Sequence, residues 1–477
     1  MINFIKYFYR YTSLIYTLYG YITTNKDDKN MILLDKLIEQ IKCCGSVAIK
    51  FCQWSIPKLE VMYLKKEDIH NNIKPLWLKK FEQFYENCET HDIKYTFDSY
   101  KKSFNHNLTS DYEILDIIGS GSIGQVYLLQ DKPLTEFTDP KKYILKIVHP
   151  NVREEIYYFR IYYDIIKRLP FIKKIINQNF PFDINGFIDS FDEQSNFINE
   201  SNHLLSFHEY YLDNDSIIIP RLIKCSKDII IMTYEDGVAF DDLQCDKYNK
   251  YKIALLLTSF IRNNQRITNL NHGDLHKGNW KVKEDNGDYK LVIYDFGFSW
   301  RTPISKKRGI EQITEVFENA DVNNIDIDKL AHVFELLIKN GENKTELVKQ
   351  YLQNNLSNIR PWILDPHRIF NITVDMCVLH NLEIDPVLIQ CIIIIIQCEK
   401  IFCEYHFAST KEHTIESTEV YRKKYLDFLA YYKTNNIFHD YSKLIMKRLN
   451  DKQTEINSIF DCDKMPDSIK DLALKNI

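Results

Sequence analysis

The stretch His272–Asn279 reads HGDLHKGN, and the later stretch Ile293–Gly297 reads IYDFG. Asp274 and Asn279 lie five residues apart, and Asp295 follows Asn279 by sixteen residues. Phosphoryl transfer uses one carboxylate to receive the acceptor's proton, an amide five residues later for Mg²⁺, and a second carboxylate on a following strand for the same metal. The spacing therefore predicts a phosphoryl-transfer site, with Asp274 as general base or acceptor-positioning carboxylate and with Asn279 and Asp295 as Mg²⁺ ligands.

The composition is that of a large globular protein. The chain has 477 residues, of which 45% are hydrophobic and 27% charged, so it can bury a core large enough for two lobes and extensions. A net charge of -5, without any long Lys/Arg block, excludes a nucleic-acid-binding role. The eleven cysteines include no C-x-x-C pair, which indicates free thiols in a reducing compartment.

The hydrophobic periodicity predicts an α+β fold, with a small antiparallel sheet, a dominantly helical part after it and a helical N-terminal extension. We expect strands at residues 112–118, 125–129, 143–149, 217–219 and 228–233, and long helices at residues 152–177 and 183–212. Beyond Gly237 we expect helices, including a buried one at Leu388–Ile401, apart from the strand before Asp295. The predicted divisions are an extension at residues 1–110, an N-lobe with inserted helices at 111–236, a C-lobe at 237–440 and a tail at 441–477.

A glycine-rich turn lies between two of these strands, where Ile118–Val126 reads IGSGSIGQV. The chain has only 13 glycines, and three of them fall within this turn. A plain hairpin turn is the alternative explanation, but the position upstream of Lys146 favours a backbone that lies over phosphates without interference from Cβ atoms. The residues expected to contact the nucleotide here are Gly119, Ser120, Gly121, Ser122, Gly124 and Val126.

Lys146 lies in the middle of an apolar strand, ILKIV, where a charge needs a partner. We expect its ammonium to hold the ATP phosphates and Glu200 to orient it, with Glu193 as the less favoured partner. The strand ending in IIIMTYEDG should form the hinge between the lobes, with the adenine contacted by backbone groups near Met232, Thr233 and Glu235.

Together these segments resemble the UbiB/ADCK family of atypical kinases over roughly residues 40–410. The resemblance rests on Lys50-x-x-Gln53, the SIGQV that ends the glycine-rich turn, Lys146 followed by His149-Pro150, the HGDLHKGN loop and the DFG at Asp295. Members of that family fold an N-terminal lysine-glutamine motif over the active site, carry an alanine-rich nucleotide loop and support ubiquinone biosynthesis through ATP binding and hydrolysis. The resemblance implies a two-lobed, protein-kinase-like fold, with a small antiparallel-sheet N-lobe, a helical C-lobe and a helical N-terminal extension. It also implies that this chain binds MgATP and that Lys50 and Gln53 regulate the site.

The chain departs from the family pattern in three places. The family's K-x-G-Q is KFCQ here, with Cys52 in the glycine position, and its E-x-D aligns with Gln194–Asn196, which reads QSN. The loss of that acidic pair leaves Lys50 without its expected carboxylate partner, which predicts a weakened inhibitory contact. The nucleotide loop has glycines in place of alanines, which widens its backbone choices and favours a pose suited to transfer.

Two other functions remain open. Serine/threonine kinases carry a lysine two residues after the catalytic aspartate, but here that position is His276 and the lysine is Lys277. The run HGDLH also resembles aminoglycoside and choline kinases, whose acceptors are small alcohols, so the acceptor could be a protein, a lipid or a small molecule. The third reading is a non-catalytic ATP-binding switch or scaffold, against which the complete set of Asp274, Asn279 and Asp295 argues.

The first residues, Phe4–Tyr21, are aromatic and weakly basic, and they form no convincing transmembrane helix. We expect a helix packed on the kinase body, with a peripheral membrane contact as the alternative. The location predicted is intracellular and cytoplasmic, with membrane-surface or mitochondrial association left open, since the segment is a poor transit peptide.

Overall fold

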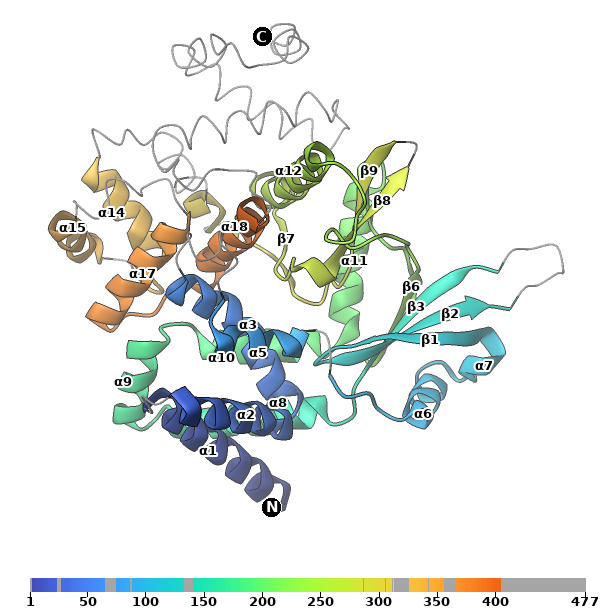
Figure 1. Cartoon of the computed structure of the whole chain (residues 1–477), viewed down its shortest axis with the longest axis horizontal. Helices are drawn as coiled ribbons and strands as arrows, with labels where there is room; N and C mark the ends of the chain where they lie inside the picture. The colour runs from blue at the N-terminus through green and yellow to red at the C-terminus, as the bar shows by residue number, and fades with distance from the viewer. Residues whose placement is uncertain are drawn as a thin grey trace, which may run out of the picture.

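Two lobes and a helical extension make up the structure, a computed structural model of the chain (Figure 1). It describes residues 2–23, 27–64, 74–85, 88–132, 140–285, 287–304, 306–310, 312, 326–341, 343–355 and 366–404. The predicted tail, residues 441–477, and the predicted C-lobe beyond Glu404 lie outside the described residues. None of the helices in the described part combines the length and the hydropathy that spanning a bilayer requires.

Five antiparallel strands form the sheet of the small lobe, in the order β1-β2-β3-β6-β5. They are β1 (Tyr112–Ser120), β2 (Gly124–Asp131), β3 (Lys142–Val148), β5 (Leu222–Cys225) and β6 (Ile229–Thr233). One face packs on α6 (Ile93–Phe104) and α7 (Leu108–Asp111) through Tyr127, Leu145 and Ile147. The opposite face, which includes Ile144 and Val148, packs on α11 (Phe197–Tyr211). Because side chains alternate along a strand, Lys146 lies on the α11 face.

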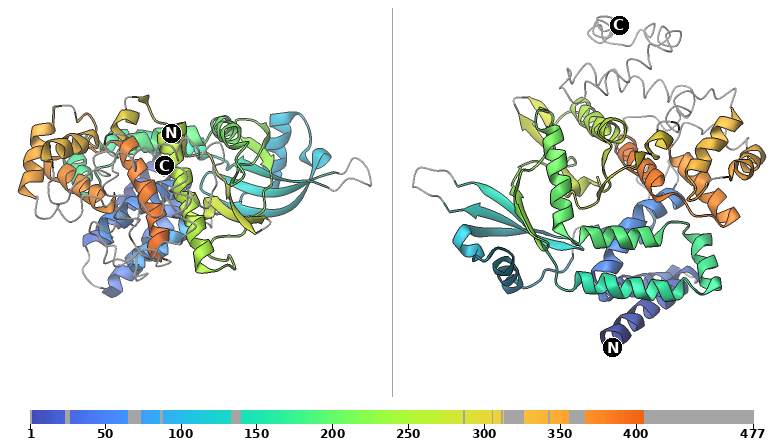
Figure 2. Two further views of the ribbon diagram at one scale, coloured as in Figure 1. Left: turned by 90° about the horizontal axis from the view of Figure 1, so that it is seen from above. Right: turned by 180° about the vertical axis from the view of Figure 1, so that it is seen from behind.

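The extension begins with three long helices, α1 (Ile2–Thr23), α2 (Asp27–Cys44) and α3 (Ser46–Tyr63), followed by the short α5 (Leu76–Phe81) and η1 (Glu82–Tyr85). The helices inserted after β3 are α8 (Val152–Ile166), α9 (Pro170–Asn179) and α10 (Ile184–Gln194). Seen from both sides, they lie beside the extension instead of the sheet (Figures 1 and 2). Aromatic rings of Tyr7, Tyr11 and Tyr162 fill the contact between α1 and α8.

The large lobe combines helices with two small sheets. The strands are β4 (Ile217–Ile218), β9 (Asp288–Ile293) and β8 (Trp280–Asp285) in one sheet, and β7 (Leu270–His272) with β10 (Ser299–Arg301) in the other. The helical elements are α12 (Lys247–Asn263), η2 (Asn264–Thr268), η3 (Lys277–Asn279), α14 (Ile327–Leu336), α15 (Thr345–Asn354), α17 (Pro366–His380) and α18 (Pro386–Glu404). The predicted buried helix at 388–401 is α18, whose Leu388, Ile393 and Ile394 are at most 2% exposed.

The two-lobed fold is confirmed, whereas several predicted elements have other boundaries. The helix expected at 152–177 ends at Ile166 and restarts at Pro170, since proline favours the first turn of a helix over its interior. The helix expected at 183–212 breaks at Ser195–Asn196, where the Asn196 side chain caps α11 by accepting from Ile198 N at 3.2 Å. The strands β5, β7, β8 and β10 were not predicted.

Candidate functional site

The loop after β7 carries Asp274 and is braced by His272. The Tyr294 carbonyl can only accept a hydrogen bond, so His272 Nε2 donates to it at 2.9 Å and Nδ1 accepts from Asp274 N at 3.3 Å. Burial lowers the pKa of His272, which suits this neutral form. Asn279 closes the loop by donating its Nδ2 to the Asp274 carbonyl at 2.7 Å.

The carboxylate of Asp274 faces two nitrogen groups. Lys50 Nζ lies 3.5 Å from Oδ2, and His276 Nε2 lies 4.0 Å from Oδ1. Burial alone would raise the pKa of Asp274, but His276 and Lys50 together lower it. Asp274 is thus a carboxylate at neutral pH and can accept a proton or orient a hydroxyl.

Asp295 follows β9 in an unusual backbone conformation. Its φ is +54°, in the left-handed region, where the six other non-glycine residues found among the described residues are all asparagines. Asp tolerates this region better than most residues, and such conformations are enriched at functional sites. The turn brings Asp295 Oδ1 within 3.0 Å of Lys146 Nζ and 3.2 Å of Gly297 N.

Lys146, Glu200 and Asp295 form a cluster of three charges between the lobes. Lys146 Nζ donates to both Glu200 oxygens at 3.0 Å as well as to Asp295. Burial lowers the pKa of Lys146, but the carboxylates of Asp295 and Glu200 outweigh it and raise the pKa overall. Burial raises the pKa of Glu200 to about 7, opposed by the positive charge of Lys146 and aided by the negative charge of Asp295. The neighbouring Lys146 and Lys50 hold the pKa of Asp295 below its usual range against the effect of burial.

The glycine-rich turn joins β1 to β2, with Gly121 N donating to Gly124 O at 3.0 Å. A Cβ on Gly124 would collide with the Ile147 carbonyl of β3, so this position needs glycine. A Cβ on Gly119 would have no atom within 4 Å. Gly124 is therefore required for the close packing of β2 on β3, whereas the protein would leave room for a side chain at position 119.

The predicted hinge residues lie at the end of β6. Met232 is buried, and the Thr233 backbone N donates to Arg221 O at 2.9 Å within the sheet. The Thr233 hydroxyl donates to Glu235 Oε1 at 2.8 Å, and the Glu235 carbonyl accepts from Tyr294 at 2.9 Å. Two of the backbone groups expected to face adenine, Thr233 N and Glu235 O, therefore already have protein partners.

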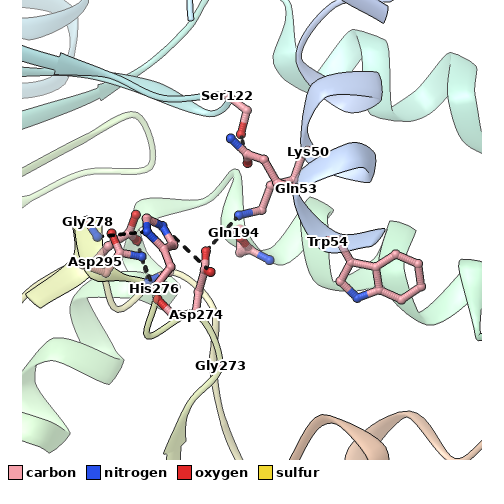
Figure 3. A network of polar contacts seen from close by, with 12 residues as sticks. Lys50, Gln53, Trp54, Ser122, Gln194, Gly273, Asp274, His276, Gly278 and Asp295 are labelled. Atoms are coloured by element: carbon pink, nitrogen blue, oxygen red, sulfur yellow. Dashed lines mark hydrogen bonds and ion pairs between the residues drawn. The ribbon is translucent and has the colours of Figure 1, made fainter. Parts of the chain in front are cut away.

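Helix α3 brings Lys50 and Gln53 into the space between the lobes (Figure 3). Gln53 Oε1 accepts from the Ser122 hydroxyl at 2.9 Å, and its Nε2 donates to Phe84 O at 2.6 Å. Cys52 points elsewhere, into an apolar cluster with Ile56 and Trp77, so the thiol does not prevent docking.

Lys50 lacks the carboxylate partner of the family pattern, but it pairs with another carboxylate. Gln194, which replaces the family's glutamate, lies beside Lys50 in Figure 3 but is neutral, and its Nε2 bonds Ser190 Oγ at 3.2 Å. Lys50 instead reaches across to Asp274. The docking of α3, which depends on long-range contacts, produced this pairing and left no local signal in the sequence.

Two histidines behind the glycine-rich turn were also missed as site residues. His149 Nε2 lies 3.0 Å from Gly121 O, and His149 Nδ1 lies 2.8 Å from His91 Nδ1. The HP after β3 was a signal for His149, whereas His91 lies in the extension, far away in sequence.

Residues 83–328, more than half of the chain, match the model of the ABC1 atypical kinase-like domain. A probable serine/threonine-protein kinase, abkC, of Dictyostelium discoideum is 27% identical over 265 residues, which are 54% of this chain and 36% of that protein. The chain thus spans about a third of the length of this curated relative.

Solved structures with similar folds include the complex of Rv3197 with erythromycin from Mycobacterium tuberculosis, at 18% identity and a TM-score of 0.34, covering 70% of this chain and 82% of that one. The Rio2 kinase complex with ADP/Mg²⁺ and phosphoaspartate from Chaetomium thermophilum follows at 13% identity and a TM-score of 0.26, covering 60% and 75%. The match to the domain model over half the chain, on a two-lobed kinase-like fold, shows that the chain belongs to the ABC1 atypical kinase-like family, the UbiB/ADCK group that its sequence resembles.

Proposed function

We propose that this chain binds MgATP between its lobes and transfers or hydrolyses the γ-phosphate. The observation that carries the proposal is the ion cluster of Lys146 with Glu200 and Asp295, close to the loop that holds Asp274. In this role Lys146 contacts the α and β phosphates and Glu200 orients it, while Asp274 receives or positions the acceptor. Packing alone does not explain three ionisable groups at this place, because burying ions costs free energy.

The oxygen atoms present suit Mg²⁺. Asn279 uses its Nδ2 to brace the loop, so its Oδ1 is the atom left for a metal, and Asp295 has Oδ2 beyond the oxygen bonded to Lys146. Among the described residues no group of three or more His, Cys, Asp or Glu could hold a metal by itself. Mg²⁺ commonly binds through one or two protein oxygens with phosphate and water completing its shell, so the pair fits. The ion would neutralise charge on the phosphates.

The nucleotide would lie under the glycine-rich turn, from Gly119 to Val126, with its base near Met232, Thr233 and Glu235. Gln53 holds Ser122 of that turn from the side of α3. Lys50 pairs with the carboxylate of Asp274, to which an acceptor would bind. We infer that the Lys50–Gln53 segment restrains turnover in this conformation.

The decisive test is phosphate release from MgATP by the full chain. We expect turnover by the wild type and a loss of at least about 100-fold in Asp274→Asn, the scale of a well-placed general base. Asp285→Asn, on the distal end of β8, is the matched control and should behave as wild type. If wild type binds MgATP but neither releases phosphate nor labels itself, the non-catalytic switch becomes the better reading.

A small-alcohol acceptor remains the second candidate, because His276 stands where serine/threonine kinases have lysine. A substrate panel of choline, aminoglycosides and generic protein acceptors separates the two. Efficient phosphorylation of choline or an aminoglycoside would replace the UbiB-like proposal by small-molecule phosphotransfer. Phosphorylation of protein alone would exclude it.

We also propose that α1 makes a peripheral membrane contact. Five of its apolar or aromatic side chains are more than 60% exposed, namely Ile5, Tyr9, Tyr16, Tyr19 and Ile22. The helix contains Lys6 and Arg10 but no acidic residue, a composition that suits the surface of anionic lipid bilayers. The full chain should float with vesicles containing phosphatidylglycerol, and Tyr9→Ser/Tyr16→Ser should float less. Equal flotation of both proteins, or self-association that the double variant abolishes, would reject the membrane contact.

The functional divisions that we propose are those predicted: an extension to residue 110, an N-lobe to 236 and a C-lobe beyond it. The observed end of the five-stranded sheet at Thr233 supports the second boundary. Limited proteolysis with and without MgATP would test whether cleavage falls near these boundaries.

A further inference from the structure

A chain of polar side chains runs behind the glycine-rich turn on the sheet face covered by α6. Gln125 and Tyr127 of β2 are fully buried, and Thr96 of α6 is fully buried beside them. Gln125 Nε2 lies 2.8 Å from the Tyr127 hydroxyl, and Tyr127 lies 2.8 Å from Thr96 Oγ1. Thr96 is 3.0 Å from His91 Nε2, which continues the chain to His149 and the turn.

The first end of this chain has a fixed polarity. The backbone N of His91 can only donate, and it lies 2.8 Å from Gln125 Oε1. This contact fixes the orientation of the Gln125 amide, so Gln125 Nε2 must donate to Tyr127. The Tyr127 hydroxyl therefore donates its single proton to Thr96 Oγ1, and the Thr96 hydroxyl donates its own to His91 Nε2.

The other end has a fixed polarity as well. Gly121 O can only accept, so His149 must carry its proton on Nε2, which also faces Ser120 Oγ at 3.3 Å. A neutral His149 then has an acceptor at Nδ1, and His91 must donate to it from its own Nδ1. His91 is left with an acceptor at Nε2, which is the role that the first end requires. Both ends therefore define one direction for every hydrogen bond.

The hydrogen bond donated by His149 decides which way the Gly121 carbonyl points. Tyr127 belongs to the apolar cluster between the sheet and α6, whereas Lys146 lies on the opposite face of the sheet. A carbonyl held by His149 is drawn towards the α6 side and away from Lys146. Its negative end would otherwise compete with phosphates for the positive charge of the site.

We propose that His149 is a positioning residue that holds the Gly121 carbonyl away from the bound nucleotide, and that the chain from Gln125 through His91 keeps His149 in the required tautomer. This inference rests on the proposed MgATP function and assigns the loop a support that lies outside the phosphate site. Burial lowers the pKa of His91 to about 4, aided by His149 and opposed by Asp92. Burial also lowers the pKa of His149 against the bond to Gly121. Both rings are therefore neutral at pH 7, as the assigned directions demand.

The first test reads the tautomers directly. The full chain labelled with ¹⁵N-histidine should show His149 protonated at Nε2 and His91 at Nδ1 in two-bond ¹H–¹⁵N correlation spectra. Signals are assigned by their disappearance in His149→Phe and His91→Phe. Any other pair of tautomers, or a charged ring at pH 7, overturns the assignment.

The second test measures MgATP affinity together with the thermal unfolding midpoint. His149→Phe removes the donor and should weaken binding about 5- to 30-fold, whereas His149→Gln keeps an N–H at the Nε2 position and should stay within about 3-fold of wild type. The control is His208→Phe, since His208 also contacts a carbonyl, Ile219 O, at 3.1 Å but lies away from the turn. Its affinity should equal that of wild type.

Thr96→Val provides a variant that does not alter either ring. It removes the donor to His91 Nε2, so His91 can change tautomer and binding should weaken a few-fold. Equal MgATP affinity in wild type, His149→Phe and Thr96→Val overturns the inference but leaves the proposed function standing. An equal loss of affinity in His149→Phe and His149→Gln has the same meaning. Absence of MgATP binding by wild type would overturn the proposed function and this inference with it.

Discussion

Replacing Lys50 by methionine should speed ATP turnover, because the side chain keeps its length but loses the ammonium that contacts Asp274. At the observed 3.5 Å, Coulomb's law gives about 5 kcal/mol for an effective dielectric constant of about 20. The side chains are 12% and 27% exposed, so desolvation of the ammonium and screening at Asp274 offset most of this. A net contribution of about 1–2 kcal/mol remains, between the values for exposed and buried pairs.

If Lys50 must withdraw before the acceptor binds, the same free energy appears as about a 5- to 30-fold increase in kcat/KM for Lys50→Met. Rates of phosphate release at saturating and at limiting MgATP measure this change in kcat/KM. Lys42→Met is the matched control, because Lys42 is 41% exposed and pairs with Glu39 on the surface of α2, away from the site. A Lys50→Met protein that folds and binds MgATP normally but turns over no faster than wild type would refute the reasoning, and slower turnover would show that Lys50 assists the chemistry.

Three further changes have expected outcomes. Asp295→Asn removes one of the two carboxylates around Lys146, so the Mg²⁺-dependent part of ATP affinity should fall at least about 10-fold while binding in EDTA changes little, as measured by calorimetry. Burial raises the pKa of Glu155 to about 7 although it accepts from Ser46 N at the start of α3, so its folded-state pKa lies above the unfolded value. The stability of wild type relative to Glu155→Gln should therefore fall by about 1–2 kcal/mol as the pH rises from about 4.5 to 7, which denaturant titrations at several pH values can detect; a difference that grows with pH would contradict the assignment. Gly124→Ala should destabilise the protein by about 2 kcal/mol or more through the collision with β3, whereas Gly119→Ala should change its free energy of unfolding by less than about 0.5 kcal/mol.

The sequence predicted those parts of the site whose signal is local. The five-residue spacing of Asp274 and Asn279 defines a loop, and both residues lie in it, linked by a hydrogen bond. Lys146 in an apolar strand required a buried partner, and the structure places Glu200 against it. In the first case the spacing within one loop leaves few arrangements, and in the second a buried ammonium needs a carboxylate partner.

Other features were hidden because they depend on contacts between distant segments. The strands β7 and β10 have three residues each, too few for a periodic pattern, and they exist because they pair with each other. The Lys50–Asp274 contact joins segments more than 200 residues apart, so no local motif in the sequence signals it. The tautomer of His149 follows from a glutamine, a tyrosine and a threonine that are unremarkable in sequence.

Helix α3 has a consequence for the order in which the chain can fold. Glu60 near its end pairs with Lys400 of α18 at 2.5 Å, a contact that spans 340 residues. Contacts of such long sequence separation form late, because loop closure must come before the contact stabilises anything. During synthesis α3 leaves the ribosome early but cannot make this contact until α18 has followed it. The helix that carries Lys50 and Gln53 should therefore settle among the last elements, which leaves the nascent lobes open between synthesis and closure.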